Sequence, residues 1–336
     1  MTTYNAVMLT KKGGPEVLAR VTLPIVDPGP GEARVRVLAC GVGYTDVIMR
    51  RGYYPFAPKI PFVPGYEIVG EVDAVGPGVT ALAKGDRVAG LLVHGGYAEF
   101  VVRGAEEFIL VPAELDSVDV VASILNYVTA LQMIERVAKP AKGDTALVTG
   151  ANGGVGQALL ELLRDRGVRA IGAASERHHG VVRALGAEPI ESRGATLEAG
   201  VRAIVPDGVD VAFDGLGGKY FGDALRATKK GGIAVAYGFT ATMVNGSASL
   251  TGVLRTYASI YLGARMSGRR AEFYGITAIY RDDPGPFRED LPKVFRMLKE
   301  GRIRPAIAER LPLLDARRAN EAIERGGVSG KIVLVA

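Results

Sequence analysis

The stretch TALVTGANGGVGQALLELL, residues 145–163, decides the fold of this chain. It begins with an apolar segment typical of a buried strand and ends with apolar residues at helical spacing. Between the two, glycines and other small residues let the backbone turn tightly. The free N–H groups at the start of such a helix can bind a pyrophosphate. The stretch therefore predicts a dinucleotide-binding loop made of Gly150, Ala151, Asn152, Gly153, Gly154, Val155 and Gly156.

The segments around this loop repeat the order of strand and helix. Further buried strands are expected at RAIGAA (169–174), VDVAFDG (209–215) and GGIAVAYG (231–238), with helical segments between them. Such alternation is typical of a doubly wound parallel sheet. We therefore expect an α/β fold with a Rossmann dinucleotide-binding domain over residues 121–299.

The first part of the chain has a different pattern. EARVRVLACGV (32–42) and EIVGEVDAVGPGV (67–79) are rich in β-branched residues, and glycine and proline turns separate them from their neighbours. This pattern predicts a second, mainly-β domain over residues 1–120. The last segment, KIVLVA (331–336), reads as a strand that returns to this domain, so residues from about 300 to 336 are expected to complete it.

Composition limits the classes of function. The chain of 336 residues has 48% apolar and 23% charged residues, ordinary values for a soluble globular protein. Its net charge of +5 comes from scattered basic residues without a nucleic-acid-binding motif, so we expect no nucleic-acid partner. Its single cysteine excludes an internal disulfide. The N-terminus lacks a signal-peptide core, and no unbroken apolar run reaches about 18 residues. We expect a cytoplasmic protein with no membrane span.

The end of the second predicted strand bears on which dinucleotide binds. Enzymes that use NAD usually carry an acidic residue there for the ribose hydroxyl. This chain has small residues followed by Ser175 and Arg177, which could both donate to a 2′-phosphate. Arg193 could add a contact from the next loop, or could lie in solvent. Glu176 argues the other way, but it lies beyond the strand end. We predict NADPH as the cofactor.

With both domains placed, the chain resembles the medium-chain dehydrogenase/reductase superfamily almost end to end. The stretches that carry the resemblance are ACGVGYTDV (39–47), PFVPGYEIVGEVDAVGPGV (61–79), KGDRVAG (84–90), GGYAEFVV (95–102), NYVTA (126–130), TGANGGVG (149–156) and VDVAFDGLGG (209–218). The resemblance implies a GroES-like catalytic domain, a Rossmann cofactor domain and an active site in the cleft between them.

The resemblance also implies that this chain works without a metal. Zinc alcohol dehydrogenases of the superfamily have side-chain ligands where this chain has Gly43 and Tyr44, then Tyr66, then Leu125. A catalytic zinc needs three protein ligands at one centre, so no metal site is expected. Cys40 lies three residues before a ligand position and reads as a small buried residue, with a reactive thiol as the alternative. The chain is most similar to the zinc-independent quinone oxidoreductase and enoyl reductase branch.

Four tyrosines are candidates for the substrate site. Tyr54 matches the tyrosine that enoyl reductases place beside the nicotinamide, and it is the candidate catalytic residue. Alternatively it lines the substrate pocket while water donates the proton. Tyr53 is a candidate pocket neighbour. Tyr44 and Tyr66 occupy former metal-ligand positions and are candidate substrate-binding residues, or simply fill the vacated space.

Other cofactor contacts are expected on the Rossmann domain. Asn126 and Thr129 match family positions near the nicotinamide, although Thr129 could equally hydrogen-bond its own helix backbone. The remaining candidates follow the carboxyl ends of two strands, where open α/β sheets bind ligands: Gly215, Tyr237, Gly238 and Phe239.

The sequence thus predicts an NADPH-dependent reductase that transfers hydride to a quinone or to the activated double bond of an α,β-unsaturated carbonyl. The expected substrate is small and apolar. The alternatives are an enoyl-thioester or polyketide-tailoring enoyl reductase, and a non-catalytic NADPH-binding relative. An apolar candidate edge strand, AEFYGITAIY (271–280), favours a homodimer.

Overall fold

The computed structural model describes residues 2–192, 197–244 and 247–336, and the chain divides into two compact units. Unit 1 contains Met1–Leu125 and Gly285–Ala336, and unit 2 contains Asn126–Pro284. The chain therefore leaves unit 1, forms unit 2 and returns. The domain limits predicted from the sequence, 1–120 and 121–299, stay a prediction.

Unit 2 is built on a parallel sheet of six strands. In chain order these strands are β8 (Thr145–Thr149), β9 (Arg169–Ala174), β10 (Glu188–Glu191), β11 (Val209–Asp214), β12 (Thr228–Ala236) and β15 (Arg270–Phe273). Their order across the sheet is β10-β9-β8-β11-β12-β15, and every neighbouring pair is parallel. This is the doubly wound order of a Rossmann domain, which confirms the predicted fold class. The order reverses between β8 and β11, where such sheets bind ligands.

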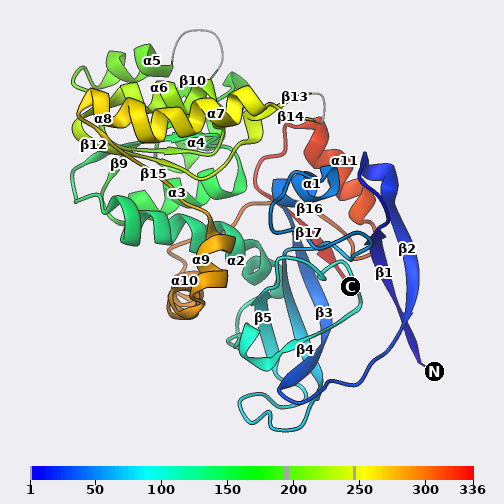
Figure 1. Cartoon of the computed structure of the whole chain (residues 1–336). Coiled ribbons are helices and arrows are strands. Elements are labelled where there is room, and N and C mark those ends of the chain that lie inside the picture. The colour runs from blue at the N-terminus through cyan, green and yellow to red at the C-terminus, as the bar shows by residue number, and fades with distance from the viewer. Residues whose placement is uncertain (1, 193–196, 245–246) are drawn as a thin grey trace. The chain divides into compact units, whose positions relative to one another are not determined.

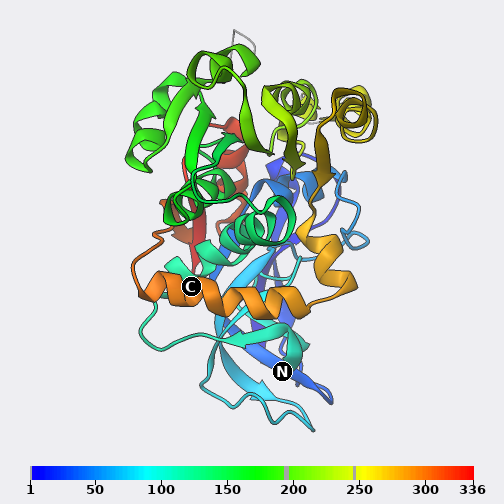
Figure 2. The ribbon, with the colours of Figure 1, turned by 90° about the vertical axis from the view of Figure 1, so that its left-hand side faces the viewer.

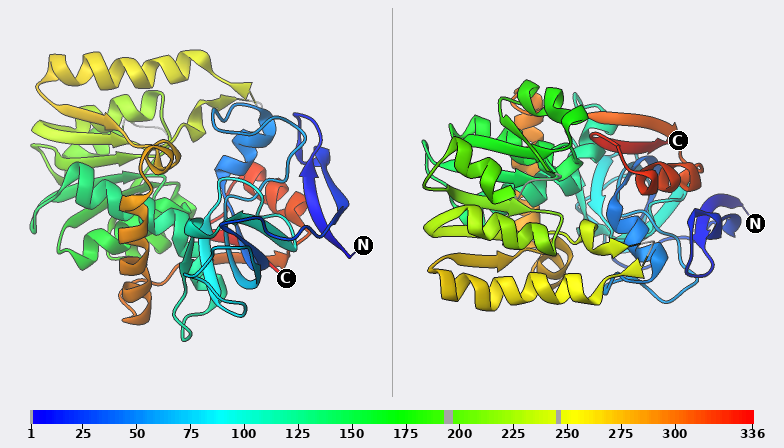
Figure 3. Two further views of the ribbon diagram at one scale, coloured as in Figure 1. Left: turned by 60° about the horizontal axis from the view of Figure 1, so that its bottom comes forward. Right: turned by 90° about the horizontal axis from the view of Figure 1, so that it is seen from above.

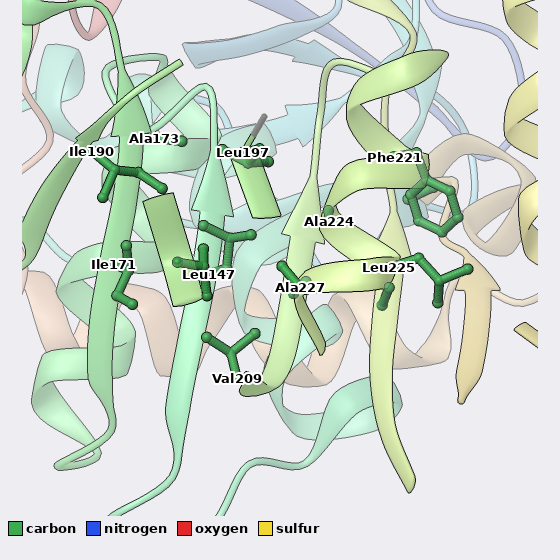
Figure 4. Packing of buried hydrophobic residues seen from close by; sticks show 14 of the residues in the cluster. Leu147, Ile171, Ala173, Ile190, Leu197, Val209, Phe221, Ala224, Leu225 and Ala227 are labelled. Atoms are coloured by element: carbon green, nitrogen blue, oxygen red, sulfur yellow. The ribbon is translucent and has the colours of Figure 1, made fainter. Parts of the chain in front are cut away.

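Helices cover both faces of this sheet (Figures 1 and 3). The described part of unit 2 contains, after α2 (Ser117–Gln132), the helices α3 (Gly154–Asp165), α4 (His179–Ala184), α5 (Leu197–Ile204), α6 (Lys219–Ala227), α7 (Leu250–Ala258), α8 (Ala264–Ser267) and α9 (Ile276–Asp282), with π-helical residues Ser259–Gly263 between α7 and α8. Shorter elements are the 3-10 turns Glu176–His178 and Thr240–Thr242 and the strand pair β13 (Met243–Val244) and β14 (Ser247–Ala248). In the core, Leu147 and Ile171 of the strands pack with Phe221 and Leu225 of α6 (Figure 4).

The edge strand of unit 2 is shorter than the sequence predicts. Residues 271–280 were expected to form one strand, but β15 ends at Phe273 and α9 begins at Ile276. Gly275 is the residue that precedes the helix. The apolar run therefore divides between two elements, because periodicity over a short run does not separate a strand from a helix.

Unit 1 is mainly β. Its strands are β1 (Thr3–Leu9), β2 (Leu18–Pro24), β3 (Glu32–Val42), β4 (Glu67–Val75), β5 (Arg87–Leu91), β6 (Phe100–Gly104), β7 (Phe108–Leu110), β16 (Ile307–Pro312) and β17 (Lys331–Val335). The main sheet has the order β16-β17-β3-β4-β5-β7, and β6 also pairs with β3. β17 lies antiparallel to β3 with Leu334 opposite Cys40, which confirms that the last strand returns to the first domain.

Besides the first part of a longer helix at the boundary, the described part of unit 1 contains the helices α1 (Tyr44–Arg51), α10 (Gly285–Lys299) and α11 (Ala316–Arg325). Two 3-10 turns, Pro15–Val17 and Ala105–Glu107, lie between strands. Helix α10 lies beside the segment that contains β7 (Figure 2), since Arg288 donates to the carbonyl of Glu106 at 2.7 Å and Lys299 pairs with Glu114.

The boundary between the units falls within one long apolar helix. Helix α2 (Ser117–Gln132) continues as the π-helical residues Met133–Ala138. Among the described residues, this helix alone is long and apolar enough to cross a membrane, with 83% of its most apolar window buried in the protein. No membrane span was expected from the sequence. A buried core helix meets the same criteria, so the helix is weak evidence for a membrane span.

Candidate functional site

The glycine loop of unit 2 joins the end of β8 to the start of α3. Gly150 has a φ of +61°, a conformation that favours glycine, and its carbonyl accepts a hydrogen bond from the Gly153 N–H at 2.9 Å. A Cβ added to Gly156 would lie 2.3 Å from the carbonyl oxygen of Gly150. The turn therefore needs glycine at both positions. Gly153, the residue before α3, has no side chain that could cap the N–H groups at the start of this helix.

Two polar residues of α2 belong to the same unit as this loop. The Asn126 side chain lies against Gly154, because a Cβ there would be 2.3 Å from the Asn126 amide nitrogen. Thr129 is 5% exposed, and its hydroxyl has no hydrogen-bond partner within the described residues. The hydrogen bond from the Thr129 hydroxyl to its own helix backbone, which was one of the two alternatives expected from the sequence, is therefore not formed. An unpaired buried hydroxyl costs about 1–3 kcal/mol, which a ligand could recover.

Glycines also bring the ends of β11 and β12 close together. A Cβ on Gly238 would lie 2.5 Å from the Gly215 carbonyl oxygen, and one on Gly215 would lie 2.8 Å from the Tyr237 ring. Burial and the nearby Asp214 carboxylate raise the pKa of the Tyr237 phenol, so this phenol stays protonated. Phe239 stacks on Phe273 with ring centroids 5.3 Å apart.

Asp214 is a further candidate site residue, which was not predicted from the sequence. It ends β11, is fully buried, and accepts hydrogen bonds from the Thr149 hydroxyl and from the Gly217 N–H, the latter at 2.7 Å. Burial raises the pKa of Asp214 to about 6, against the opposing effect of these bonds. The carboxylate thus joins the ends of β8 and β11, where the sheet order reverses. The sequence does contain an indication of this pair, because Thr149 in VTG and Asp214 in FDG are polar residues at the ends of two predicted strands.

The end of β9 contains groups of both charges. The Ser175 hydroxyl lies 3.1 Å from Nδ1 of His178, and Arg177 is exposed. The Glu191 carboxylate at the end of β10 accepts a bond from the Glu176 N–H at 2.9 Å, and the sequence analysis did not foresee this acidic neighbour. Arg193, predicted to contact the cofactor, lies outside the described residues. The preference for a 2′-phosphate stays a prediction.

In unit 1, the structure brings two of the four candidate tyrosines together. The hydroxyls of Tyr54 and Tyr66 are 2.8 Å apart, and their rings meet edge to face with centroids separated by 6.3 Å. Tyr53 is 44% exposed. Tyr44 lies at the start of α1. Burial and the Glu324 carboxylate raise the pKa of its phenol, against a smaller opposing effect of Arg51. The substrate-binding roles of Tyr44, Tyr53 and Tyr66 stay predictions.

Buried charges surround the former metal-ligand positions. Glu67 forms an ion pair with Lys331 of β17 and accepts a bond from the Leu125 N–H at 2.7 Å. Asp46 of α1 accepts bonds from the Gly43 N–H at 2.9 Å and from the Gly65 N–H at 3.3 Å. Burial raises the pKa of Asp46 to about 6. The ammonium of Lys331 is the cation that balances this acidic cluster.

The described part of the chain contains no group of three or more His, Cys, Asp or Glu residues able to hold a metal ion. Cys40 is fully buried, which confirms the structural reading of this residue. Burial, together with the Asp46 and Glu67 carboxylates, raises the pKa of its thiol well above the usual value. The thiol is therefore held in its unreactive, protonated form.

A Rossmann unit with a glycine loop, combined with a mainly-β unit that the chain leaves and re-enters, is the domain arrangement found in two-domain dehydrogenases. Comparison with known families agrees: the GroES-like domain of alcohol dehydrogenases matches residues 29–113, and the zinc-binding dehydrogenase domain matches residues 185–334. The rat quinone oxidoreductase is 30% identical over 340 residues, which cover 98% of this chain and 97% of that protein. The chain belongs to the medium-chain dehydrogenase/reductase superfamily, in its quinone oxidoreductase-like branch.

Two further relatives have similar sequences or structures. The rat synaptic vesicle membrane protein VAT-1 homolog is 33% identical over 257 residues, which cover 75% of this chain but only 64% of that protein. This chain thus matches less than two thirds of that relative's length. A mycobacterial protein solved in complex with NADPH is 29% identical, with a TM-score of 0.87 over 99% of this chain and 100% of that one.

Proposed function

We propose that this chain is an NADPH-dependent oxidoreductase that reduces a quinone or the activated double bond of an α,β-unsaturated carbonyl without zinc. The observation that carries the proposal is the buried, unpaired Thr129 hydroxyl in the unit that holds the glycine loop. A buried polar group without a partner is unfavourable unless a ligand completes it. The rat quinone oxidoreductase and the mycobacterial complex with NADPH support the same cofactor and reaction class.

The residues present fit the dinucleotide. Gly150–Gly156 and the start of α3 would hold the pyrophosphate, and Asn126 and Thr129 would bind the nicotinamide end. Ser175 and Arg177 would bind the 2′-phosphate. When bound, the cofactor supplies a hydride. Gly215, Gly238 and the residues beside them would let the backbone approach it closely.

Tyr54 is the proposed proton donor. Reduction of an activated double bond or a quinone needs a proton in addition to the hydride, and a positioned phenol can supply it. The developing negative charge on the substrate oxygen also needs a hydrogen-bond donor. Placement of both units around one active-site cleft stays a prediction from the family resemblance.

The deciding experiment follows NADPH absorbance with a panel of quinones, free enones and enoyl thioesters, and repeats it with NADH. We expect oxidation of NADPH with quinones or free enones. Turnover of thioesters alone would favour the carrier-linked enoyl reductase. Tight NADPH binding without turnover of any acceptor would contradict the enzymatic proposal and leave a non-catalytic binding protein.

Zinc independence has its own test. The positions that match the family's zinc-binding residues hold Gly43 and Tyr44, then Tyr66, then Leu125, and none of these has the cysteine, histidine or carboxylate side chain that holds zinc. We expect less than one tenth of a zinc ion per chain by elemental analysis of the active protein, and full activity after dialysis against a chelator. Stoichiometric zinc that is lost together with activity would contradict this expectation.

We also propose a homodimer and a cytoplasmic location. The short strand β15 lies at an edge of the sheet, and the neighbouring helical segment exposes Tyr261, Leu262 and Met266, of which Met266 is 81% exposed. Apolar exposure beside a sheet edge favours association. Light scattering coupled to size exclusion should give twice the chain mass of 35.4 kDa. A monomer mass across a range of concentrations would contradict the dimer.

A further inference from the structure

Tyr66 is more deeply buried than its partner Tyr54. It is 2% exposed, and its carbonyl accepts hydrogen bonds at 2.9 Å from the N–H groups of Leu92 and Val93. Tyr54 lies in the loop after α1 and is only partly buried. The two hydroxyls are 2.8 Å apart, so the more exposed phenol of Tyr54 is hydrogen-bonded to the buried phenol of Tyr66. The backbone of Tyr66 is in turn hydrogen-bonded to the neighbouring segment.

We propose that Tyr66 is a positioning residue for Tyr54: its hydroxyl donates to the Tyr54 oxygen, orients that phenol and stabilises the phenolate that forms when Tyr54 gives up its proton. This inference rests on the proposed function. It assigns a role to a position where metal-dependent relatives carry a ligand. Tyr66 acts through Tyr54 and need not touch the substrate.

The surroundings keep Tyr66 suited to donating. Burial, the contact with Tyr54 and the Glu67 and Asp46 carboxylates all raise the pKa of the Tyr66 phenol well above its usual value. Lys331, the buried cation of this region, is already paired with Glu67. A phenol whose pKa is raised in this way keeps its proton, so Tyr66 is suited to donate a hydrogen bond to the Tyr54 oxygen. A neutral hydroxyl that donates to an anionic oxygen makes a short, strong hydrogen bond.

The proton balance is simple. As the hydride reaches the acceptor, the Tyr54 O–H bond breaks and its proton forms the new bond to the α-carbon of an enone or to an oxygen of a quinone. The electron pair stays on the Tyr54 oxygen, where the Tyr66 O–H donates to it. Water returns a proton to Tyr54 after the product leaves. Tyr66 keeps its own proton throughout.

A purely structural role for Tyr66 makes a different prediction. If the ring only fills the space of the missing metal, Tyr66→Phe keeps the same ring and should change neither catalysis nor the ionisation of Tyr54. The phenylalanine variant therefore isolates the hydroxyl. Tyr97→Phe is the control for loss of a buried hydroxyl: Tyr97 is another fully buried tyrosine of unit 1, and its hydroxyl accepts from Asn320 at 3.4 Å and hydrogen-bonds the Asp46 carboxylate.

The first test is a double-mutant cycle on kcat. We expect Tyr66→Phe to lower kcat about 10-fold with little change in KM, and to change it less than 2-fold when Tyr54 is already phenylalanine. Tyr97→Phe should lower kcat less than 2-fold. An equal loss from Tyr66→Phe in both backgrounds, or no loss in either, would overturn the proposal.

The second test needs neither cofactor nor turnover. Ring-labelled tyrosine NMR, with the Tyr54 signal assigned from its absence in Tyr54→Phe, gives the pKa of Tyr54 in the free protein. We expect Tyr66→Phe to raise this pKa by about one unit, a 10-fold change in the ionisation constant, and Tyr97→Phe to leave it unchanged. An unchanged Tyr54 pKa in folded Tyr66→Phe protein would refute the pairing. The expected shift in a protein that reduces no acceptor would instead refute the proposed function alone.

Discussion

At the residue scale, removal of the Thr129 hydroxyl should change stability and cofactor binding in opposite directions. Its hydroxyl is buried without a partner in the described structure, so the free protein bears a cost that a bound nicotinamide would remove. Thr129→Val deletes the hydroxyl and keeps a similar shape. We expect the variant to gain about 1 kcal/mol in free energy of unfolding while it binds NADPH about 10-fold more weakly. Urea unfolding and NADPH fluorescence titration measure the two quantities, and a loss of stability would show that the hydroxyl already has a partner.

Residue Gly156 should tolerate no side chain. A Cβ there would lie 2.3 Å from the Gly150 carbonyl oxygen and 2.8 Å from the Cα of Ala151, so the loop backbone would have to move. We expect Gly156→Ala to weaken NADPH binding more than 10-fold. Gly180→Ala is the control, because that added Cβ meets open space in α4. It should leave binding unchanged and stabilise the protein by about 0.5–1 kcal/mol. Equal affinities for NADPH in the two variants would contradict the role of the loop.

At the scale of elements, the buried ion pair of Glu67 in β4 with Lys331 in β17 can be tested by removing one or both charges. The two side chains are 0% and 4% exposed. Lys331→Met leaves a carboxylate buried without its cation and should cost about 3–5 kcal/mol of unfolding free energy. Adding Glu67→Gln removes that uncompensated charge, so the double variant should recover a large part of the loss. Urea unfolding of the single and double variants measures the effect, and purely additive losses would be the contrary result.

Elements with strong local signals could be predicted from the sequence. The strand at 169–174 coincides with β9, and β8 ends at Thr149 as the glycine loop requires. The return of β17 to the first domain followed from the need of a lone strand for a partner, whereas its pairing with β3 in particular was not predicted. The division of residues 271–280 between β15 and α9 could not be read, because a short apolar run has no clear period.

Only part of the candidate site could be predicted from the sequence. The glycines and tyrosines could be chosen as candidates because the residue type alone indicates what each can do. The hydrogen bond of Tyr54 with Tyr66 spans 12 residues and that of Thr149 with Asp214 spans 65, and no local pattern encodes such contacts. The same holds for Glu191, which approaches Glu176 only because β9 and β10 are paired.

At the scale of the whole molecule, each unit contains a buried aspartate whose pKa is raised from 3.8 to about 6: Asp46 in unit 1 and Asp214 in unit 2. Each therefore holds its proton more tightly in the folded state than in the unfolded chain. Between about pH 4 and pH 6 the folded protein binds more protons, so this contribution to stability is present at low pH and is lost as the pH rises. The loss is about 1.4 kcal/mol per pH unit for each group.

Asp46→Asn and Asp214→Asn each remove one of these titrations. Either substitution also alters the hydrogen bonds at its site, but an amide does not titrate, so the pH dependence isolates the charge. We expect the free energy of unfolding of the native chain, relative to either variant, to fall by about 1.4 kcal/mol per unit between pH 4.5 and 5.5, and twice as steeply relative to the double variant. Urea unfolding at half-unit steps of pH measures these differences. Parallel curves for native protein and variants would mean that the two carboxyls ionise in the folded protein as they do in water, and the geometry that buries them would then need another explanation.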